Sequence, residues 1–123
     1  MSKLILHIDD EQPIREMVHE LLSSSGYRVR SVATPTEAVR AMHEEAPALI
    51  ISDLQLDEAD GLQTIAQLQQ IRANTPVILL TGVLIDPVVA RKTLGRHVNA
   101  YLEKTRPIAD IVAEVTRLIG PAA

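Results

Sequence analysis

The strongest constraint on the fold is a regular alternation of short aliphatic runs with segments of helical periodicity. Runs rich in Ile, Leu and Val, each about the length of a strand, recur along the chain. They are Leu4–Ile8, Tyr27–Val32, Ala48–Ser52, Val77–Leu80 and Ala100–Leu102. Strands that alternate with helices usually pair in parallel, so the pattern favours a parallel sheet with helices on both faces.

A helix is expected after each run, because apolar residues there recur every three or four positions. Thr34 suits the N-cap of the second helix, and Gly26 suits the end of the first. The expected helices begin near Pro13, Pro35, Leu62, Pro87 and Pro107. Right-handed crossovers then give an α/β fold: a three-layer, doubly wound (βα)5 domain with a five-stranded parallel sheet.

Composition limits the class of protein. The 123 residues fit one domain, 1–123, and the 46% of apolar residues are enough for a core. A net charge of −4 gives no basic surface for direct nucleic-acid binding, and the absence of Cys excludes disulfides and thiolate chemistry. The apolar runs are too short to span a membrane, and acids follow the N-terminus too closely for a signal peptide. We therefore expect a cytoplasmic protein with no membrane partner.

Polar side chains stand where four of the five expected strands end. Asp9 and Asp10 follow the first strand, and Asp53 follows the third. Thr81 follows the fourth strand, and Lys104 comes shortly after the fifth. Ligands of open parallel sheets bind outside the carboxyl ends of the strands, so these five side chains are expected to converge on one edge.

The expected cluster has a consistent chemistry. Three neighbouring carboxylates repel one another and favour a hard divalent cation, above all Mg²⁺. Lys104 supplies a compact positive charge and Thr81 a hydroxyl donor for phosphoryl oxygens. One carboxylate could then act as a nucleophile and carry an acyl phosphate. The set predicts phosphoryl transfer, which depends mainly on positioning and charge neutralisation.

Taken together, these motifs resemble the receiver domains of two-component response regulators, over essentially the whole chain. They are "HIDDE" at the end of the first strand, Asp53, "DG" at Asp60-Gly61, "TG" at Thr81-Gly82 and "YLEK" at Tyr101–Lys104. Each motif is weak alone, but their order and their positions at strand ends make the set specific. The resemblance implies the flavodoxin-like strand order 2-1-3-4-5.

The resemblance also implies a role for each residue of the metal half of the site. Asp53 would be the phosphoacceptor and, like Asp10, a direct ligand of Mg²⁺. Asp9 would hold a water of the ion's shell. The backbone carbonyl of Gln55 would be the third protein ligand.

The remaining roles concern the phosphoryl group and the response to it. Thr81 would bind the phosphoryl group and move toward it, and Lys104 would pair with it. Tyr101 would be the aromatic switch that turns inward when Thr81 moves. The response would change a face made by the helix from Asp86, the strand at Ala100–Leu102 and the helix that ends near Ile119.

The resemblance further implies the partners. A histidine kinase or a histidine phosphotransfer protein would donate the phosphoryl group, and a downstream protein would bind the switched face, through which a homodimer could also form. The chain would not be an enzyme in the usual sense, since it would catalyse only its own phosphorylation and dephosphorylation. The sequence leaves open whether it acts alone or as the receiver of a larger protein.

Three positions depart from the family pattern. Thr105 stands where a cis proline usually follows the lysine, which leaves the placement of Lys104 open because a cis bond before another residue is costly. Leu56-Asp57 replaces the common Met-Pro and adds an acid. Val83, two residues past Thr81, is apolar beside the expected path of an attacking water, which predicts slow loss of the phosphoryl group.

Other interpretations stay open at this point. Asp9 and Asp10 could simply favour the start of the following helix. The chain could be a receiver-like binding module that is never phosphorylated, or a small Mg²⁺-dependent phosphatase, although Gln55 stands where such enzymes carry a second acid. His7, inside the first strand, is expected to be buried, neutral and hydrogen-bonded, and not a ligand or phosphodonor.

Overall fold

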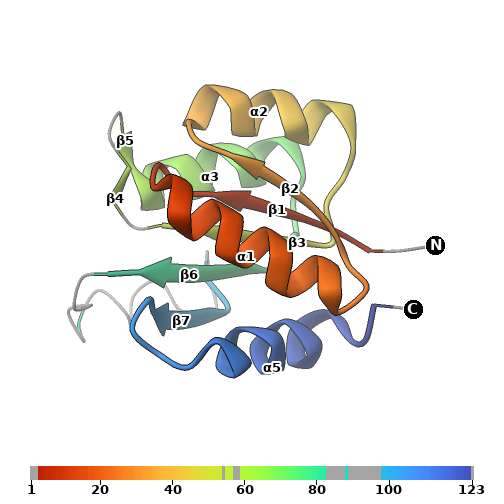
Figure 1. The fold of residues 1–123 in the computed structure, drawn as a ribbon. Helices are drawn as coiled ribbons and strands as arrows, with labels where there is room; N and C mark the ends of the chain where they lie inside the picture. The colour runs from red at the N-terminus through yellow and green to blue at the C-terminus, as the bar shows by residue number, and fades with distance from the viewer. Residues whose placement is uncertain (1–2, 54, 57–58, 83–87, 89–97, 123) are drawn as a thin grey trace.

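The computed structural model describes residues 3–53, 55–56, 59–82, 88 and 98–122 (Figure 1). The strands are β1 Leu4–Ile8, β2 Arg28–Val32, β3 Leu49–Ser52, β4 Gln55–Leu56, β5 Ala59–Asp60, β6 Val77–Thr81 and β7 Ala100–Glu103. The helices are α1 Gln12–Ser24, α2 Pro35–Glu44, α3 Gly61–Ile71 and α5 Ile108–Ile119. Apart from Val88, the helix expected from Pro87 falls outside the described residues.

Five of the strands form one parallel sheet in the order β2-β1-β3-β6-β7. Counted along the five strands of this sheet, that is the predicted order 2-1-3-4-5, and the doubly wound fold is confirmed. α1 and α5 cover one face of the sheet, and α2 and α3 cover the other (Figure 1). β2 is an edge strand, and of its five residues only Val32 is buried.

Each face of the sheet has its own aliphatic core. Ile5 of β1 packs with the residues of α1 and α5, whereas its neighbour Leu6 packs with those of α2 and α3. β3 and β6 are buried along their whole length, because helices cover them on both sides. The two layers hold the central strands firmly, and the carboxyl ends of these strands build the site described below.

Local signals set the helix boundaries. α1 begins with proline in its first turn, and Thr34 caps α2 by accepting a hydrogen bond from the backbone N–H of Glu37. Gly26 follows α1 with φ of 97°, a left-handed conformation that glycine adopts without strain. Pro13, Thr34 and Gly26 therefore lie at helix ends, as the sequence predicts.

A small antiparallel hairpin between β3 and α3 was not expected. Gln55 and Leu56 pair with Asp60 and Ala59, and Gly61 then begins α3. Strands of two residues carry no periodicity, so the sequence gives no signal for them.

The two ends of the described chain lie together, at the end of the sheet opposite the carboxyl ends of the strands (Figure 1). Lys3 Nζ donates to the carbonyls of Ile119 and Pro121, and Tyr27 Oη donates to the carbonyl of Gly120 at 2.6 Å. These contacts fasten the end of α5 to the start of β1 and to the turn after α1. No helix among the described residues is long and apolar enough to cross a membrane.

Candidate functional site

Four carboxylates gather at the carboxyl ends of β1 and β3. Asp9, Asp10, Glu11 and Asp53 each offer an oxygen atom, and these atoms lie within 4.8 Å of one another. The sequence predicts three of the four, and the structure adds Glu11. Asp53 is in place because its backbone N–H continues the sheet by donating to the carbonyl of Ile8 at 3.1 Å.

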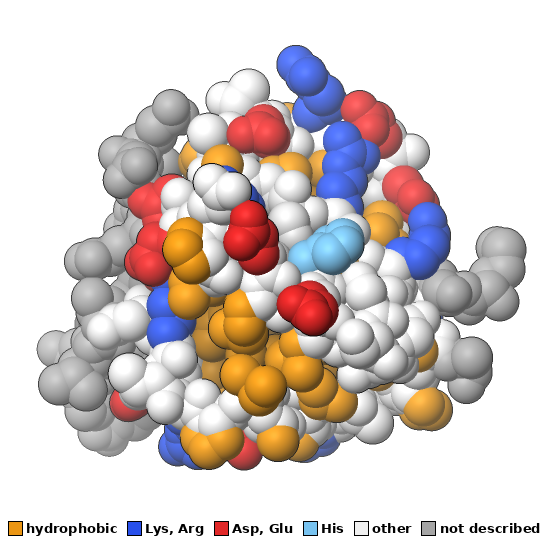
Figure 2. All heavy atoms as spheres, in the orientation of Figure 1, with side chains coloured by type: hydrophobic (Ala, Val, Ile, Leu, Met, Phe, Trp, Pro, Cys, Tyr) orange, Lys and Arg blue, Asp and Glu red, His pale blue; other side chains and the backbone are white. Residues whose placement is uncertain are grey.

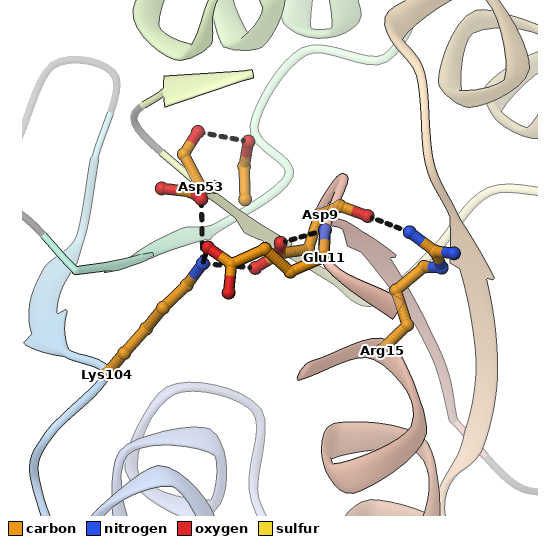
Figure 3. A network of polar contacts seen from close by, with 6 residues as sticks. Asp9, Glu11, Arg15, Asp53 and Lys104 are labelled. Atoms are coloured by element: carbon orange, nitrogen blue, oxygen red, sulfur yellow. Dashed lines mark hydrogen bonds and ion pairs between the residues drawn. The ribbon is translucent and has the colours of Figure 1, made fainter. Parts of the chain in front are cut away.

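Lys104 reaches into this acidic cluster from the end of β7. Its ammonium nitrogen lies 2.8 Å from Asp53 Oδ2, 2.9 Å from Asp9 Oδ2 and 3.2 Å from Glu11 Oε1 (Figure 3). Its backbone N–H donates to the carbonyl of Thr81 at 2.8 Å, which ties the end of β7 to the end of β6. The predicted meeting of Lys104 with the acids is therefore observed.

The bond from Lys104 to Thr105 is trans, since no peptide bond among the described residues is cis. The sequence left the placement of the lysine open at this bond. The structure shows that the side chain reaches Asp53 with an ordinary peptide at this position.

Burial and the neighbouring charges act in opposite directions on the pKa values of Asp9 and Lys104. Burial raises the pKa of Asp9, although the hydrogen bonds from Lys104 and from the backbone N–H of Glu11 work in the opposite direction. For Lys104, burial alone would lower the pKa of the ammonium. The hydrogen bonds and charges of Asp53 and Asp9 outweigh burial, so the pKa is raised and the lysine stays charged.

The backbone groups and Oδ1 of Asp9 each have a hydrogen-bond partner, and its Oδ2 has Lys104 as its charge partner. Its N–H donates to the carbonyl of Val32 at 3.1 Å, and its Oδ1 accepts from the N–H of Glu11 at 2.9 Å. Its Oδ2 faces Lys104, and its carbonyl oxygen accepts from Nη1 of Arg15 at 2.7 Å (Figure 3). Asp9 is thus fixed by contacts from a strand, a turn, a helix and Lys104.

Asp10 is the opposite case. Its side chain is half-buried, and its carboxylate makes no hydrogen bond or ion pair within the described part of the chain. A carboxylate that belongs to the cluster but lacks a protein partner is well suited to bind a cation directly.

Thr81 and Tyr101 share one face of the sheet. Thr81 is fully buried at the end of β6, and Tyr101 on β7 pairs with Leu79 of β6. Since alternate residues of a strand face the same side, Thr81 and Leu79 point toward the α2 and α3 side, where Tyr101 also packs. Burial raises the pKa of the Tyr101 phenol.

His7 differs from its prediction in one respect. The ring is fully buried and neutral, because burial, followed by the charges of Lys104 and Arg15, lowers its pKa to about 3. The predicted hydrogen bond is wrong, since neither ring nitrogen has a hydrogen-bond partner among the described residues. The neighbours on the adjoining strands are Ile51, which is apolar, and Ser31, whose hydroxyl also lacks a partner.

Sequence reasoning missed two residues of the site. Glu11 completes the acidic cluster, and the run of three acids after the first strand was a signal for it. Arg15 contacts the carbonyl of Asp9 from one turn into α1, and no pattern in the sequence indicated that contact. Of the other positions discussed, Gln55 lies in β4, whereas Asp57, Val83 and most of the expected fourth helix lie outside the described residues.

The donor set suits Mg²⁺. All the converging ligands are carboxylate oxygens, and no histidine or sulfur of the described residues joins the cluster. Hard oxygen donors of this kind favour Mg²⁺ or Ca²⁺ over softer metals. Asp10 in particular offers a carboxylate with no hydrogen bond or ion pair to the described part of the protein.

The fold and the site together define a class: a flavodoxin-like α/β domain with an acidic cluster and a buried lysine at the carboxyl ends of its strands. A family model described as the response regulator receiver domain matches residues 5–116. The chain belongs to this family, whose members work in two-component signalling.

Curated relatives support the assignment. The chain is 36% identical to the transcriptional regulatory protein GlrR of Escherichia coli, over 86% of this chain and 28% of that protein. It is also 36% identical to the alkaline phosphatase synthesis transcriptional regulatory protein PhoP of Bacillus subtilis, over 89% of this chain and 44% of that protein. The chain thus spans less than half the length of these two relatives.

Solved structures show the same fold. Chemotaxis protein CheY4 of Vibrio cholerae superposes with a TM-score of 0.88 at 22% identity, covering 96% of this chain and 99% of that one. Response regulator protein TrrA of Thermotoga maritima, solved in complex with Mg²⁺ and BeF, gives a TM-score of 0.80 at 26% identity, covering 94% and 98% of the two chains.

Proposed function

We propose that this receiver domain accepts a phosphoryl group on Asp53 in a Mg²⁺-dependent reaction. The observation that carries the proposal is the position of the Asp53 carboxylate, 2.8 Å from the Lys104 ammonium and inside a cluster of four acids. A carboxylate is a weak nucleophile unless its surroundings neutralise the charge that builds up during transfer. Here a buried ammonium stands in contact with the proposed nucleophile.

In the proposed reaction, an oxygen of Asp53 forms a bond to the phosphorus of a phosphohistidine. The phosphorus–nitrogen bond breaks, and the imidazole leaves with the electron pair and takes up a proton. The aspartyl phosphate carries more negative charge than the carboxylate did, so Lys104 would pair with a phosphoryl oxygen. Thr81, at the end of the neighbouring strand, would donate its hydroxyl to another.

Asp10, Asp53 and the backbone carbonyl of Gln55 would hold the Mg²⁺, and Asp9 would hold one of its waters. When bound, Mg²⁺ neutralises the carboxylates and polarises phosphoryl oxygens. Both carboxylate oxygens of Asp9 have protein contacts, Oδ1 with the N–H of Glu11 and Oδ2 with Lys104, so Asp9 is less available for a direct bond than Asp10. This difference supports the assignment of Asp10 as the direct ligand and Asp9 as the outer one.

The response would run from Thr81 to Tyr101. Both residues lie on the side of the sheet that faces α2 and α3, so movement of Thr81 toward a phosphoryl group would open space on the face where the ring of Tyr101 packs. Phosphorylation would shift an existing equilibrium between two conformations. The surface that changes would include β7 and α5, with the segment from residue 86.

We propose a histidine kinase or a histidine phosphotransfer protein as the phosphodonor, and a protein target for the switched surface, which could also pair with a second copy. Two of the relatives are named as transcriptional regulatory proteins and are longer than this chain. Residues 1–123 would form one receiver domain, which itself would not bind nucleic acid and would act in the cytoplasm.

The proposal is tested by incubating the protein with acetyl phosphate and Mg²⁺ and measuring the mass of the intact protein by mass spectrometry. We expect the mass of one phosphoryl group on the wild type, no adduct on Asp53→Asn, and no adduct when Mg²⁺ is removed by chelation. An unmodified wild type in Mg²⁺ would instead support a receiver-like binding module that is not regulated by phosphorylation.

A further inference from the structure

Arg15 is the one basic residue of α1 that contacts the backbone of the acidic turn. It lies one turn into the helix, and its Nη1 donates to the carbonyl oxygen of Asp9 at 2.7 Å (Figure 3). Its own backbone N–H donates to the carbonyl of Glu11 at 3.1 Å, which is the first hydrogen bond of the helix. The residue therefore joins the start of α1 to the peptide that leads from Asp9 to Asp10.

This contact matters because of how differently the two aspartates are held. The side chain of Asp9 is fixed by the N–H of Glu11 and by Lys104. The carboxylate of Asp10 has no hydrogen bond or ion pair within the described residues. Its direction is therefore set by the backbone, and first of all by the plane of the Asp9–Asp10 peptide, whose oxygen Arg15 holds.

The start of α1 offers little else to fix that peptide. Glu11 is the N-cap residue, and its side chain makes no capping hydrogen bond. Pro13 lacks an N–H and cannot donate to the turn. Among the described residues, the Arg15 guanidinium supplies the side-chain donor that the carbonyl accepts from.

We propose that Arg15 is a positioning residue that aims the Asp10 carboxylate at the bound cation by holding the Asp9–Asp10 peptide. The expected effect of Arg15 on Mg²⁺ affinity rests on the proposed function. The structural part of the inference, the order of the Asp10 backbone, stands independently of any metal.

Electrostatics alone predicts the opposite effect of removing Arg15. Its positive charge lies near the carboxylates but bonds to a neutral carbonyl, and no ion pair joins it to an acid among the described residues. Loss of that charge should therefore strengthen binding of a cation, whereas loss of positioning should weaken it. The sign of the change distinguishes the two accounts.

The test compares Arg15→Met, which keeps an apolar stem, with Arg15→Lys, which keeps a donor. Arg40→Met is the matched control, because Arg40 is exposed on α2 and its loss removes the same charge away from the acids. Mg²⁺ affinity is measured by calorimetry on each protein. The order of the Asp10 backbone amide is measured by ¹⁵N relaxation on the metal-free proteins.

We expect Arg15→Met to weaken Mg²⁺ binding about tenfold or more, in the range seen when partners outside the metal shell are removed. Arg15→Lys should recover most of the affinity, and Arg40→Met should match the wild type. The Asp10 amide should lose order in Arg15→Met alone. Unchanged order at Asp10, or Mg²⁺ binding to Arg15→Met as tight as or tighter than to the wild type, would overturn the inference.

A wild type that binds no Mg²⁺ would count against the proposed function and not against the role of Arg15. In that case the relaxation data decide the matter: lost order at Asp10 in Arg15→Met supports the positioning role, and unchanged order refutes it.

Discussion

The ammonium of Lys104 lies 2.8 Å from Oδ2 of Asp53, although the two residues are far apart in the sequence. Both side chains are almost completely buried, and Asp9 joins them at 2.9 Å from the same ammonium. In the absence of a metal, this one cation compensates the charge of two buried carboxylates. Lys104 therefore contributes to the stability of the fold as well as to the proposed chemistry.

Replacement of Lys104 should show that contribution directly. Lys104→Met keeps the length of the side chain but leaves buried carboxylates without their counter-charge, so we expect a loss of about 3 kcal/mol in the free energy of unfolding in metal-free buffer. Urea denaturation followed by circular dichroism measures it. The control is Arg106→Met, which breaks an exposed pair with Asp110 and should cost about 0.5 kcal/mol or less. Equal losses for the two variants would contradict this role of Lys104.

Replacement of Asp9 should have the opposite effect on stability. Burial raises the pKa of Asp9, so its ionisation favours the unfolded chain and stability falls as the pH rises through its titration. Asp9→Asn keeps an oxygen that can accept from the N–H of Glu11 and removes the buried charge. We expect the free energy of unfolding of this variant to be about 1 kcal/mol higher than that of the wild type at pH 7 without metal. We also expect it to bind Mg²⁺ more weakly.

Asp110→Asn serves as the control for that measurement, since the half-buried Asp110 pairs with the exposed Arg106, away from the acidic cluster. It should lower the free energy of unfolding by about 0.5 kcal/mol or less and leave the Mg²⁺ affinity unchanged. Asp9→Asn that is clearly less stable than the wild type at pH 7 would show that the ion pair with Lys104 outweighs the cost of burial.

Much of the fold follows from the sequence because its signals are local and repeated. The central strands β3 and β6 appear as aliphatic runs since helices bury both of their faces. Pro13 marks the start of α1 because its missing N–H is tolerated in the first turn of a helix. Thr34 marks the start of α2 because its side chain caps the helix. The hairpin β4–β5 could not be foreseen, because a strand of two residues has no period.

The site was predictable to a similar degree. Asp9, Asp10, Asp53 and Lys104 were expected together because parallel strands bring their carboxyl ends to one edge. The contacts that orient these residues could not be predicted. The hydrogen bond from Arg15 to the carbonyl of Asp9, for example, depends on the conformation of the arginine side chain. The missing partner of His7 was also unpredictable, because it depends on which residues of β2 and β3 lie beside it in register.

His7 should make stability depend on pH. Its folded pKa of about 3 lies below the ordinary value of 6.5, so the unfolded chain binds a proton more readily. The contribution of neutral His7 to the free energy of unfolding is therefore fully present above about pH 6.5. It is lost as the pH falls toward 3, at up to about 1.4 kcal/mol per pH unit. His7→Leu lacks this titration, so its stability curve should diverge upward from that of the wild type below pH 6.5.

Urea denaturation at a series of pH values measures the divergence. His43→Gln is the control, because His43 is exposed on α2 and its replacement should leave the wild-type slope unchanged. Parallel curves for His7→Leu and the wild type would mean that His7 is protonated equally in both states.

The proposed switch can be followed with a single fluorophore. The chain has two Tyr and no Trp, so Tyr27→Phe leaves Tyr101 as the only strongly fluorescent residue. If Tyr101 turns inward on phosphorylation, its fluorescence should become less sensitive to quenching by acrylamide. Thr81→Ala in the same background should abolish that change per phosphorylated molecule. Quenching that does not change on phosphorylation would argue against Tyr101 as the switch.

The central claim is that Asp53, and no other acid of the cluster, carries the phosphoryl group. The most direct test is to phosphorylate the wild type with acetyl phosphate and Mg²⁺, reduce the acyl phosphate with borohydride, and sequence the peptides by mass spectrometry. Reduction converts a phosphorylated aspartate to homoserine and so marks the acceptor permanently. We predict homoserine at position 53 alone. Homoserine at position 9 or 10, or an unmarked protein, would contradict the account.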